Sequence, residues 1–186
     1  MGKRSDGFER SPRGFYSTPV GAVAPLLWNL PDTAKIRGGV RFDDPCAGDG
    51  ALAEHLEGAG HSLALASDIH PMAEGIVEKD ALSLRRCSGD VFITNPPWPE
   101  PARRGEPTLA ILIHLSGLAP TWLLLPADFA HNVYFGRVEG RCRKIVSVGR
   151  VKWIQSTPHV GKDNAAGFLF DGAYSGPTVF HGRREV

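Results

Sequence analysis

The chain has 186 residues, of which 42% are hydrophobic and 22% are charged, and its formal net charge is +1. This length allows one domain with a sizeable core but not two ordinary ones, and the composition is typical of a soluble globular protein. The small net charge gives no global signal for polyanion binding, so any contact surface for a nucleic acid must be local.

The remaining composition excludes several classes of protein. The longest apolar runs are too short to cross a bilayer, and the polar, basic N-terminus lacks the apolar core of a secretory signal. The three cysteines, Cys46, Cys87 and Cys142, are widely spaced and form no CxxC pair. This pattern argues against a disulfide framework or a zinc site. We therefore expect a cytoplasmic protein without metal and without membrane association.

The N-terminal region is predicted to contain an arm and a helix. Residues 1–14 are charged and rich in glycine and serine, which predicts a flexible arm, and residues 15–186 are expected to form a single domain. Residues 20–30 follow the motif FYSTP and are predicted as a helix with several apolar residues on one face. Pro25 leaves the start of this helix open, because proline fits a first turn but not a helix interior.

After this helix, short apolar runs alternate with helical segments. Expected strands are 38–44, 61–68, 76–79, 90–95, 121–126, 144–154 and 165–171, and expected helical segments are 51–60, 107–118 and 127–135. This alternation predicts a three-layer α/β domain with a mostly parallel sheet. His114, on an apolar helix, is expected to be a core histidine with a hydrogen-bond partner.

A glycine loop, DDPCAGDGA, follows the first expected strand and contains Asp44, Gly48 and Gly50. Glycines there let the backbone turn sharply and approach a ligand, and the next helix offers free N–H groups. The spacing matches neither the dinucleotide fingerprint nor the phosphate loop, and alone it fits an ordinary strand-to-helix turn equally well. Asp68 ends the second strand, where a carboxylate commonly accepts hydrogen bonds from ribose hydroxyls, so it favours a ligand site.

The stretch FITNPPWPEP ends the fourth expected strand on Asn95, Pro96, Pro97 and Trp98. The prolines fix φ and lack an N–H, so the loop is stiff. The Asn95 side chain and the Pro96 carbonyl can accept the two donors of an amine group, and Trp98 offers a flat face for a planar base. For Trp98 alone, burial in the core is the more common role. Together the four residues predict a receptor for a planar group with an exocyclic amine.

These pieces and their order resemble the S-adenosylmethionine-dependent DNA adenine methyltransferases that modify the exocyclic amine and carry an NPP[YFW]-type catalytic motif. The resemblance covers residues 15–171. FYSTP (15–19) resembles the family's N-terminal cofactor-binding segment, and DPCAGDG (44–50) resembles its cofactor glycine loop. Asp68 matches the ribose-binding acid, and Asp80 matches the acidic position near the adenine of the cofactor.

The resemblance implies a three-layer Rossmann-like fold with a mostly parallel seven-stranded sheet and an antiparallel last strand. It implies S-adenosylmethionine as cofactor, double-stranded DNA as partner, and a target base flipped out of the duplex. Asn95 and the Pro96 carbonyl would hold the adenine amine while its nitrogen attacks the sulfonium methyl group, without a metal. The implied cofactor-binding residues are Phe15, Tyr16, Thr18, Pro19, Asp44, Pro45, Cys46, Gly48, Gly50, Asp68, Ile69, Asp80 and Ala81.

The implied substrate-binding residues are Arg103, Arg104, Lys152, Trp153, Lys162 and Phe168. Trp153 or Phe168 would provide a second aromatic side chain against the base, although a core role fits either one equally. Residues 137–152 hold six basic side chains, which fit either a pocket rim that contacts phosphates or a solvated surface. The chain is too short for the family's usual target-recognition domain, so a partner or an oligomer could supply sequence specificity.

Two alternatives stay open. The same fold and cofactor could serve an RNA base or a protein glutamine amide, because such enzymes use related NPP motifs; Trp98 and FYSTP favour DNA adenine. The chain could also be a non-catalytic binding protein on this scaffold. The complete glycine loop and the NPPW motif argue against that second alternative.

Overall fold

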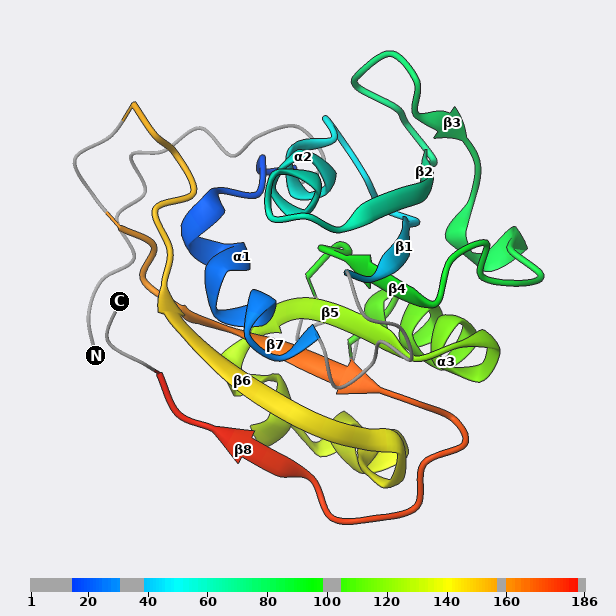
Figure 1. The fold of residues 1–186 in the computed structure, drawn as a ribbon. Helices are drawn as coiled ribbons and strands as arrows, with labels where there is room; N and C mark the ends of the chain where they lie inside the picture. Colours follow the sequence, from blue (N-terminus) through cyan, green and yellow to red (C-terminus); the bar gives the residue numbers. More distant parts are fainter. Residues whose placement is uncertain (1–14, 31–38, 99–104, 157–159, 184–186) are drawn as a thin grey trace.

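The computed structural model describes residues 15–30, 39–98, 105–156 and 160–183. The predicted N-terminal arm lies outside these residues. A single sheet forms the middle layer, with the strand order β3-β2-β1-β4-β5-β7-β6-β8 (Figure 1). The strands are β1 (Arg41–Asp44), β2 (Ser62–Asp68), β3 (Val77–Glu78), β4 (Val91–Thr94), β5 (Thr121–Pro126), β6 (Cys142–Arg150), β7 (Asn164–Phe170) and β8 (Val179–His181).

Most neighbouring strands of the sheet are parallel. β1 pairs in parallel with β2 and β4, β2 with β3, β4 with β5, and β6 with β8. β7 is antiparallel to both β5 and β6. The prediction of a mostly parallel sheet with an antiparallel strand is confirmed, and that strand is β7. The sheet has one strand more than the seven expected, because β8 pairs in parallel with β6.

Helices cover both faces of the sheet (Figure 1). Helices α1 (Val20–Leu27) and α2 (Ala51–Gly58) share one core cluster on one face. Helix α3 (Thr108–Leu118) lies on the other face, and the short 3-10 helices are η3 (Ala81–Ser83), η5 (Ala127–His131), η6 (Val133–Arg137) and η7 (Glu139–Arg141). No helix in the described parts of the chain has the length and apolar character needed to cross a membrane.

The core has two halves because successive residues of a strand point to opposite faces. Ile93 and Trp122 belong to the cluster under α1 and α2. Their neighbours Phe92 and Leu123 belong to clusters under α3. The runs VFIT and TWLLLP are therefore mostly apolar and almost entirely buried, as expected for strands that are covered on both faces.

Two helical predictions need correction. Helix α1 begins at Val20, continues through Pro25 and ends at Leu27 rather than at residue 30, and its buried residues are Ala22, Val23 and Leu26. A proline inside a helix removes one backbone hydrogen bond, and here the packing of this apolar face on the sheet outweighs that local cost. The predicted helix at 127–135 is divided into the 3-10 helices η5 and η6.

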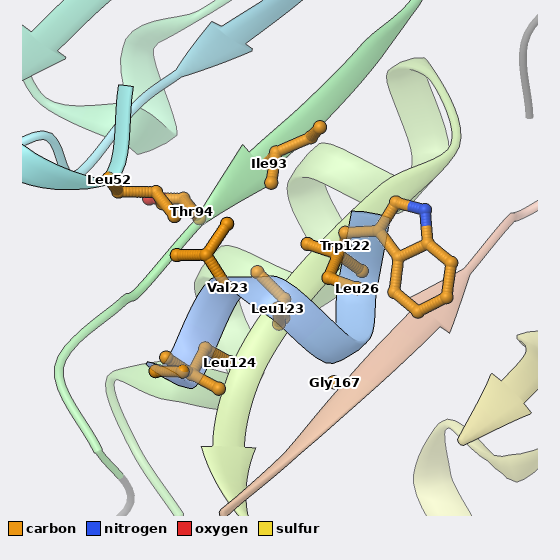
Figure 2. A pocket seen from close by; sticks show the side chains of 10 residues that line it. Val23, Leu26, Leu52, Ile93, Thr94, Trp122, Leu123, Leu124 and Gly167 are labelled. Carbon is orange, nitrogen blue, oxygen red and sulfur yellow. The ribbon is translucent and has the colours of Figure 1, made fainter. Parts of the chain in front are cut away.

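A small cavity lies between α1 and the sheet (Figure 2). Side chains from α1, α2, β4 and β5 line it, including Val23, Leu52, Ile93 and Leu124. Its volume is about 10 Å³, which is close to the smallest space that holds one water molecule. The lining is almost entirely apolar, so the cavity is a packing gap in the core rather than a ligand pocket.

Candidate active site

The carboxyl ends of the parallel strands meet at one edge of the sheet, which we call the site edge. β1 ends there at Asp44, β2 at Asp68 and β4 at Thr94. Open α/β sheets bind their ligands at this edge, because the loops that leave the strands surround a crevice there. The opposite edge, where β1 and β4 begin at Arg41 and Val91, is called the far edge below.

A polar network joins the ends of β1 and β4. The Thr94 hydroxyl donates a hydrogen bond of 2.6 Å to Asp44 Oδ1 and accepts one of 3.1 Å from the Cys46 backbone N–H. Cys46 N also lies 3.3 Å from Asp44 Oδ1. The first residues of the glycine loop are therefore held against β4, directly beside the NPPW motif.

Asp44 is fully buried at the centre of this network, and its second oxygen, Oδ2, has no hydrogen-bond partner among the described residues. Burial is the main cause that raises the pKa of Asp44 to about 7; the Thr94 and Cys46 hydrogen bonds lower it, and the Asp68 and Asp49 carboxylates add smaller raising effects. A buried carboxyl with a free oxygen is suited to a cationic ligand, which would favour its charged form. This is an observed feature of the structure that fits a positively charged cofactor.

The glycine loop bends as the sequence predicts. Gly48 and Gly50 have φ angles of 55° and 86°, in the left-handed region that glycine adopts easily. Gly50 is the residue before helix α2, and a β-carbon at Gly48 would overlap the Phe15 ring. The N-terminal FYSTP segment therefore packs directly on the glycine loop, and Gly48 is required for that contact as well as for the turn.

The end of β2 holds the predicted ribose-binding acid. Asp68 Oδ2 accepts a hydrogen bond of 2.9 Å from Gly48 N, and Oδ1 accepts one of 2.8 Å from His70 N. The next residue, Ile69, has 55% of its surface exposed. Each carboxylate oxygen can accept a second hydrogen bond, so Asp68 remains able to bind hydroxyl groups.

The predicted position near the cofactor's adenine starts a 3-10 turn. Asp80 Oδ1 accepts a hydrogen bond of 2.9 Å from Leu82 N and so caps η3, and Ala81 is buried. Leu82 is 43% exposed and was not predicted as a site residue. With Ile69 it provides exposed apolar surface on the loops after β2 and β3. Its sequence signal was its position two residues after Asp80.

Asn95 is held in place by two neighbours. Its Nδ2 donates a hydrogen bond of 3.1 Å to Thr18 Oγ1, and its Oδ1 accepts one of 3.0 Å from Trp98 Nε1. Trp98 Nε1 also lies 3.1 Å from the Leu124 carbonyl oxygen. An indole N–H can only donate, so Trp98 determines which end of the Asn95 amide is the oxygen. Thr18, from FYSTP, is buried and connects that segment to the NPPW motif.

The NPPW loop is also anchored to α3. Thr108, the first residue of that helix, donates a hydrogen bond of 2.6 Å to the Pro97 carbonyl oxygen. Pro96 is buried, whereas Pro97 is exposed. The loop therefore cannot shift without breaking contacts to β5, to α3 and to the N-terminal segment, and this rigidity agrees with the purpose inferred for its two prolines.

Solved structures share this architecture. A proposed RNA methyltransferase from Pyrococcus horikoshii matches with a TM-score of 0.59 and 17% identity, over 84% of this chain and 86% of that one. A proposed class I S-adenosylmethionine-dependent methyltransferase from Listeria monocytogenes matches with a TM-score of 0.55 and 11% identity, over 89% and 65%. The chain has the Rossmann-like methyltransferase fold.

A third structure with the methyltransferase fold is the modification subunit of a proposed type I restriction enzyme from Vibrio vulnificus. It matches with a TM-score of 0.52 and 16% identity, over 90% of this chain. The match covers 47% of that subunit, so the chain spans about half of its length. No family model matches the chain, and no curated protein matches it.

The two tryptophans of the predicted base pocket lie together on the α1 side of the methyltransferase fold. The rings of Trp98 and Trp153 meet edge to face, with 5.2 Å between their centroids. Both are half-buried against the apolar cluster that includes Leu124 and Val148. Trp98 is thus neither an open platform nor a fully buried core residue.

Of the two roles left open for Phe168, the structure shows the core role and not contact with a base. Its side chain is fully buried between Phe129 and Phe170 on the α3 side of the sheet, so it cannot contact a base at the site. The alternation of side chains along β7 sends Phe168 to that face, which a single sequence could not settle. Arg103 and Arg104 lie outside the described residues.

The other predicted site residues flank the features described above. Tyr16 and Pro19, in the FYSTP segment, are half-buried, and Pro45, in the glycine loop, is buried. Lys152 is half-buried and Lys162 is exposed, both close to Trp153 in the chain or in space. His114 is half-buried, and its Nε2 lies 2.8 Å from the Leu84 carbonyl oxygen, so the predicted hydrogen-bond partner is confirmed.

The basic stretch 137–152 is divided between the two edges of the sheet. β6 runs in the same direction as β5, so its first residues lie at the far edge and its last residue, Arg150, lies at the site edge. At the far edge, Arg141 donates hydrogen bonds to the Ile113 carbonyl oxygen and the Ser116 hydroxyl. Part of the stretch is therefore structural, and its last residues lie at the site edge.

The cysteines are free thiols at described positions. Burial raises the pKa of Cys87 to about 12 and that of Cys142 to about 11, and burial followed by the Asp44 charge raises that of Cys46 further. These thiols stay protonated at neutral pH and are poor nucleophiles. Within the described residues, no group of three or more His, Cys, Asp or Glu side chains could hold a metal ion.

Proposed function

We propose that the protein transfers a methyl group from S-adenosylmethionine to the exocyclic amine of adenine in DNA. The observation that carries the proposal is the position of Asn95 and Pro96. They lie at the carboxyl end of β4, beside the buried Asp44 and the Gly48 loop, and hydrogen bonds to Thr18 and Trp98 hold the Asn95 amide. An amide acceptor next to a cofactor-type glycine loop is the arrangement that the NPPW resemblance implies.

The residues of the site edge fit S-adenosylmethionine. When bound, this cofactor supplies a methyl group on a sulfonium centre that is already activated towards a nucleophile. Asp68 would hold the ribose hydroxyls, and the exposed Ile69 and Leu82 would contact the adenine ring. Asp44 would face the positive charges of the cofactor through its unpaired Oδ2. We infer that the same residues make the site selective for a cationic nucleoside.

Asn95 would bind and orient the amine of the target base. Its Oδ1 carries two lone pairs, and Trp98 Nε1 uses one of them, so one remains for an amine N–H. The Pro96 carbonyl is the second expected acceptor. Two acceptors on one amine draw electron density towards its nitrogen and fix its direction of attack, so the contribution of the protein is orientation and electrostatics.

The polymer that carries the amine has two candidates. FYSTP and NPPW resemble the DNA adenine enzymes and favour double-stranded DNA. RNA is the second candidate, because the proposed RNA methyltransferase from Pyrococcus horikoshii matches over most of both chains. A protein glutamine amide and a non-catalytic binding role are the weaker alternatives. We expect the protein to act in the cytoplasm, with a partner or an oligomer that supplies sequence specificity.

Methyl transfer from labelled S-adenosylmethionine tests the proposal. Unmethylated duplex DNA, RNA of the same sequence and bulk protein are incubated separately, then digested so that the methylated product is identified. Label is expected as N6-methyladenine from DNA, and duplex DNA without adenine should accept none. Label in RNA adenine would select the second candidate, and equal methylation of adenine-free DNA would exclude both.

Asn95→Ala tests the role assigned to the motif. Loss of a hydrogen-bond acceptor that acts in the transition state is expected to lower kcat by roughly 10²–10³-fold. Asn132→Ala is the matched control, because the Asn132 side chain, in the connection between η5 and η6, donates a hydrogen bond to the Asp128 carbonyl oxygen and lies outside the NPPW motif. Cofactor affinity, measured by calorimetry, should persist in both variants. Wild-type activity in Asn95→Ala would contradict the proposed chemistry.

A further inference from the structure

Four cationic side chains gather at the site edge around the end of β6, and we call this group the basic edge: Arg150, Lys152, Lys162 and Arg183. Arg150 ends β6. The side chain of Arg183, which follows β8, lies across Gly149, where a β-carbon would come within 3.2 Å of its guanidinium. β8 pairs in parallel with β6, and this pairing carries Arg183 to the site edge.

The two lysines join the group through the chain that leaves β6 and enters β7. The Gly161 backbone N–H donates a hydrogen bond of 2.8 Å to the Val151 carbonyl oxygen. This hydrogen bond places Lys162 opposite Lys152, because each is the next residue along its own segment. Asp163, beside Lys162, is the one carboxylate in the described part of these segments.

The basic edge has no internal partners in the described residues. Arg150, Lys162 and Arg183 are exposed, Lys152 is half-buried, and no ion pair or side-chain hydrogen bond of the described residues involves any of the four charged groups. At the far edge the situation differs, since Arg143 binds Asp171 at 3.3 Å and lies over the Tyr174 ring. The charges at the site edge are therefore available to a ligand.

The basic edge is continuous with the NPPW motif. Trp153 follows Lys152, and its ring meets the Trp98 ring edge to face. Trp98 in turn binds Asn95. The path from Arg183 through Gly149, Lys152 and Trp153 therefore ends at the amide that is proposed to hold the target base, and a polymer bound there would bring its anionic backbone next to that amide.

We infer that the basic edge binds the sugar-phosphate backbone of the nucleic-acid substrate, with Arg183 as a principal contact. The inference rests on the proposed function and adds the surface that brings the polymer to the site. A row of unpaired cations along a strand end suits regularly spaced phosphates, and arginine can contact a phosphate through two parallel N–H groups. The net charge of +1 is compatible with this, because the surface is local.

The dependence of affinity on salt tests the inference. Each phosphate that the protein neutralises releases a counterion, so the slope of log K against log salt falls by about 0.9 in magnitude for each phosphate that a variant no longer binds. Binding of a fluorescent 20-base-pair duplex is measured between 50 and 200 mM salt for wild type and Arg183→Glu. We expect the slope to fall by about 1 and the Kd to rise roughly tenfold at the lower salt concentration.

Arg41→Glu is the matched control. Arg41 is also exposed and its replacement changes the net charge by the same amount, but it begins β1 at the far edge. For Arg41→Glu, the salt slope and the Kd should stay within about twofold of wild type, since this variant alters only a screened long-range charge. Arg150→Ala with Lys162→Ala is a second test that leaves the Arg183–Gly149 contact in place, and it should lower the slope as well. Equal slopes for wild type, Arg183→Glu and the double variant would overturn the inference.

The outcomes separate this inference from the proposed function. Wild-type methyl transfer to DNA or RNA together with an unchanged salt slope in Arg183→Glu would contradict the role of the basic edge and leave the proposed function supported. A salt slope that depends on Arg183, without any methyl transfer, would support the nucleic-acid-binding role of the basic edge and contradict the proposed function. Loss of binding to phosphatidylserine vesicles in Arg183→Glu, with duplex binding unaltered, would assign the surface to a membrane and overturn the inference.

Discussion

Asp43 and Asp44 are neighbours on β1, and both side chains are buried, but they belong to different edges of the sheet. Asp43 accepts hydrogen bonds of 2.7 Å from Ser88 N and 3.0 Å from Gly89 N, in the loop that enters β4 at the far edge. Both of its oxygens are used. Asp44 turns towards the site edge and keeps Oδ2 without a partner among the described residues. The Asp43 carboxylate therefore stabilises the fold, whereas the Asp44 carboxylate has an oxygen that can bind a ligand.

Two arginines show the same difference between a charged group with partners inside the protein and one without them. Arg143 at the far edge has a carboxylate and a ring as partners, and Arg183 at the site edge has neither among the residues that the structure describes. Residue type and charge are equal within each pair. The presence or absence of a partner inside the protein therefore separates structural from candidate functional charges better than residue identity does, and the following variants test that distinction.

Asp44→Asn is expected to give the largest effect, a change in how stability depends on pH. The pKa of Asp44 is 3.8 in its ordinary state and about 7 in the folded protein, so the folded state holds the proton more tightly. The stability that this provides is fully present below about pH 4 and is lost as the pH rises through 7. Relative to Asp44→Asn, the wild type should lose up to about 4 kcal/mol of unfolding free energy between pH 4 and pH 8.

Urea denaturation across this pH range, without cofactor, measures the effect of Asp44→Asn. Asp43→Asn, measured in parallel, tests whether the pH dependence belongs to the site edge alone. Identical pH profiles for wild type and Asp44→Asn would show that the buried Asp44 carboxyl does not hold a proton near neutral pH.

Asp43→Ala, at the far edge, should give the next largest effect, a loss of stability. It leaves the Ser88 and Gly89 N–H groups without their acceptor, and the expected loss is about 2–3 kcal/mol of unfolding free energy at pH 7. Asp90→Ala is the control, because Asp90 is an exposed carboxylate that accepts one hydrogen bond from Arg41 N at the same edge, and it should cost less than about 1 kcal/mol. Equal losses in the two variants would break the distinction between the buried and the exposed carboxylate.

Trp98→Phe tests the polar contact within the NPPW motif. Phenylalanine keeps an aromatic ring but removes the N–H that orients the Asn95 amide. We expect kcat to fall by about tenfold, roughly 1.4 kcal/mol, while the KM for the nucleic acid and the affinity for the cofactor change little. Trp153→Phe keeps the ring contact and has no role in orienting the amide, so its kcat should stay near wild type. A raised KM with unchanged kcat in Trp98→Phe would indicate stacking instead of positioning.

Arg143→Ala and Arg183→Ala should give the smallest effects on stability. Removal of Arg143 breaks a partly exposed ion pair and a cation–π contact, at a cost of about 1 kcal/mol. Removal of Arg183 breaks no ion pair of the described residues and should change the unfolding free energy by less than about 0.5 kcal/mol. Thermal denaturation compares the two. A larger loss of stability in Arg183→Ala than in Arg143→Ala would contradict this assignment of a structural role to Arg143 and not to Arg183.

Much of the architecture could be predicted from the sequence because it depends on local pattern. The apolar runs that became β4 and β5, the glycine turn at Gly48, and the stiff loop at Pro96 are set by residues that are adjacent in the chain. The strand β8 was missed because it is short and its Val179 and Phe180 are exposed at 47% and 66%; it exists through its pairing with β6.

The assignment of individual side chains could not be predicted to the same degree. Phe168 had the right chemistry for a base pocket, but the register of β7 turns it to the other face of the sheet. Trp98 was expected to present a flat face, and the structure uses its N–H as well. Both depend on which neighbour lies across the strand or the loop, and that neighbour comes from a distant part of the chain.

The sequence by itself determined where strands end and which chemical groups stand there: a carboxylate after β1 and β2, and an amide with two prolines after β4. Turns, prolines and apolar runs act over a few residues, so their effect can be derived from the chain alone. The tertiary structure decided which of two adjacent aspartates keeps a free oxygen, which aromatic side chains reach the site, and which arginines remain unpaired. Those properties depend on contacts between segments far apart in the chain, which only the packed sheet brings together.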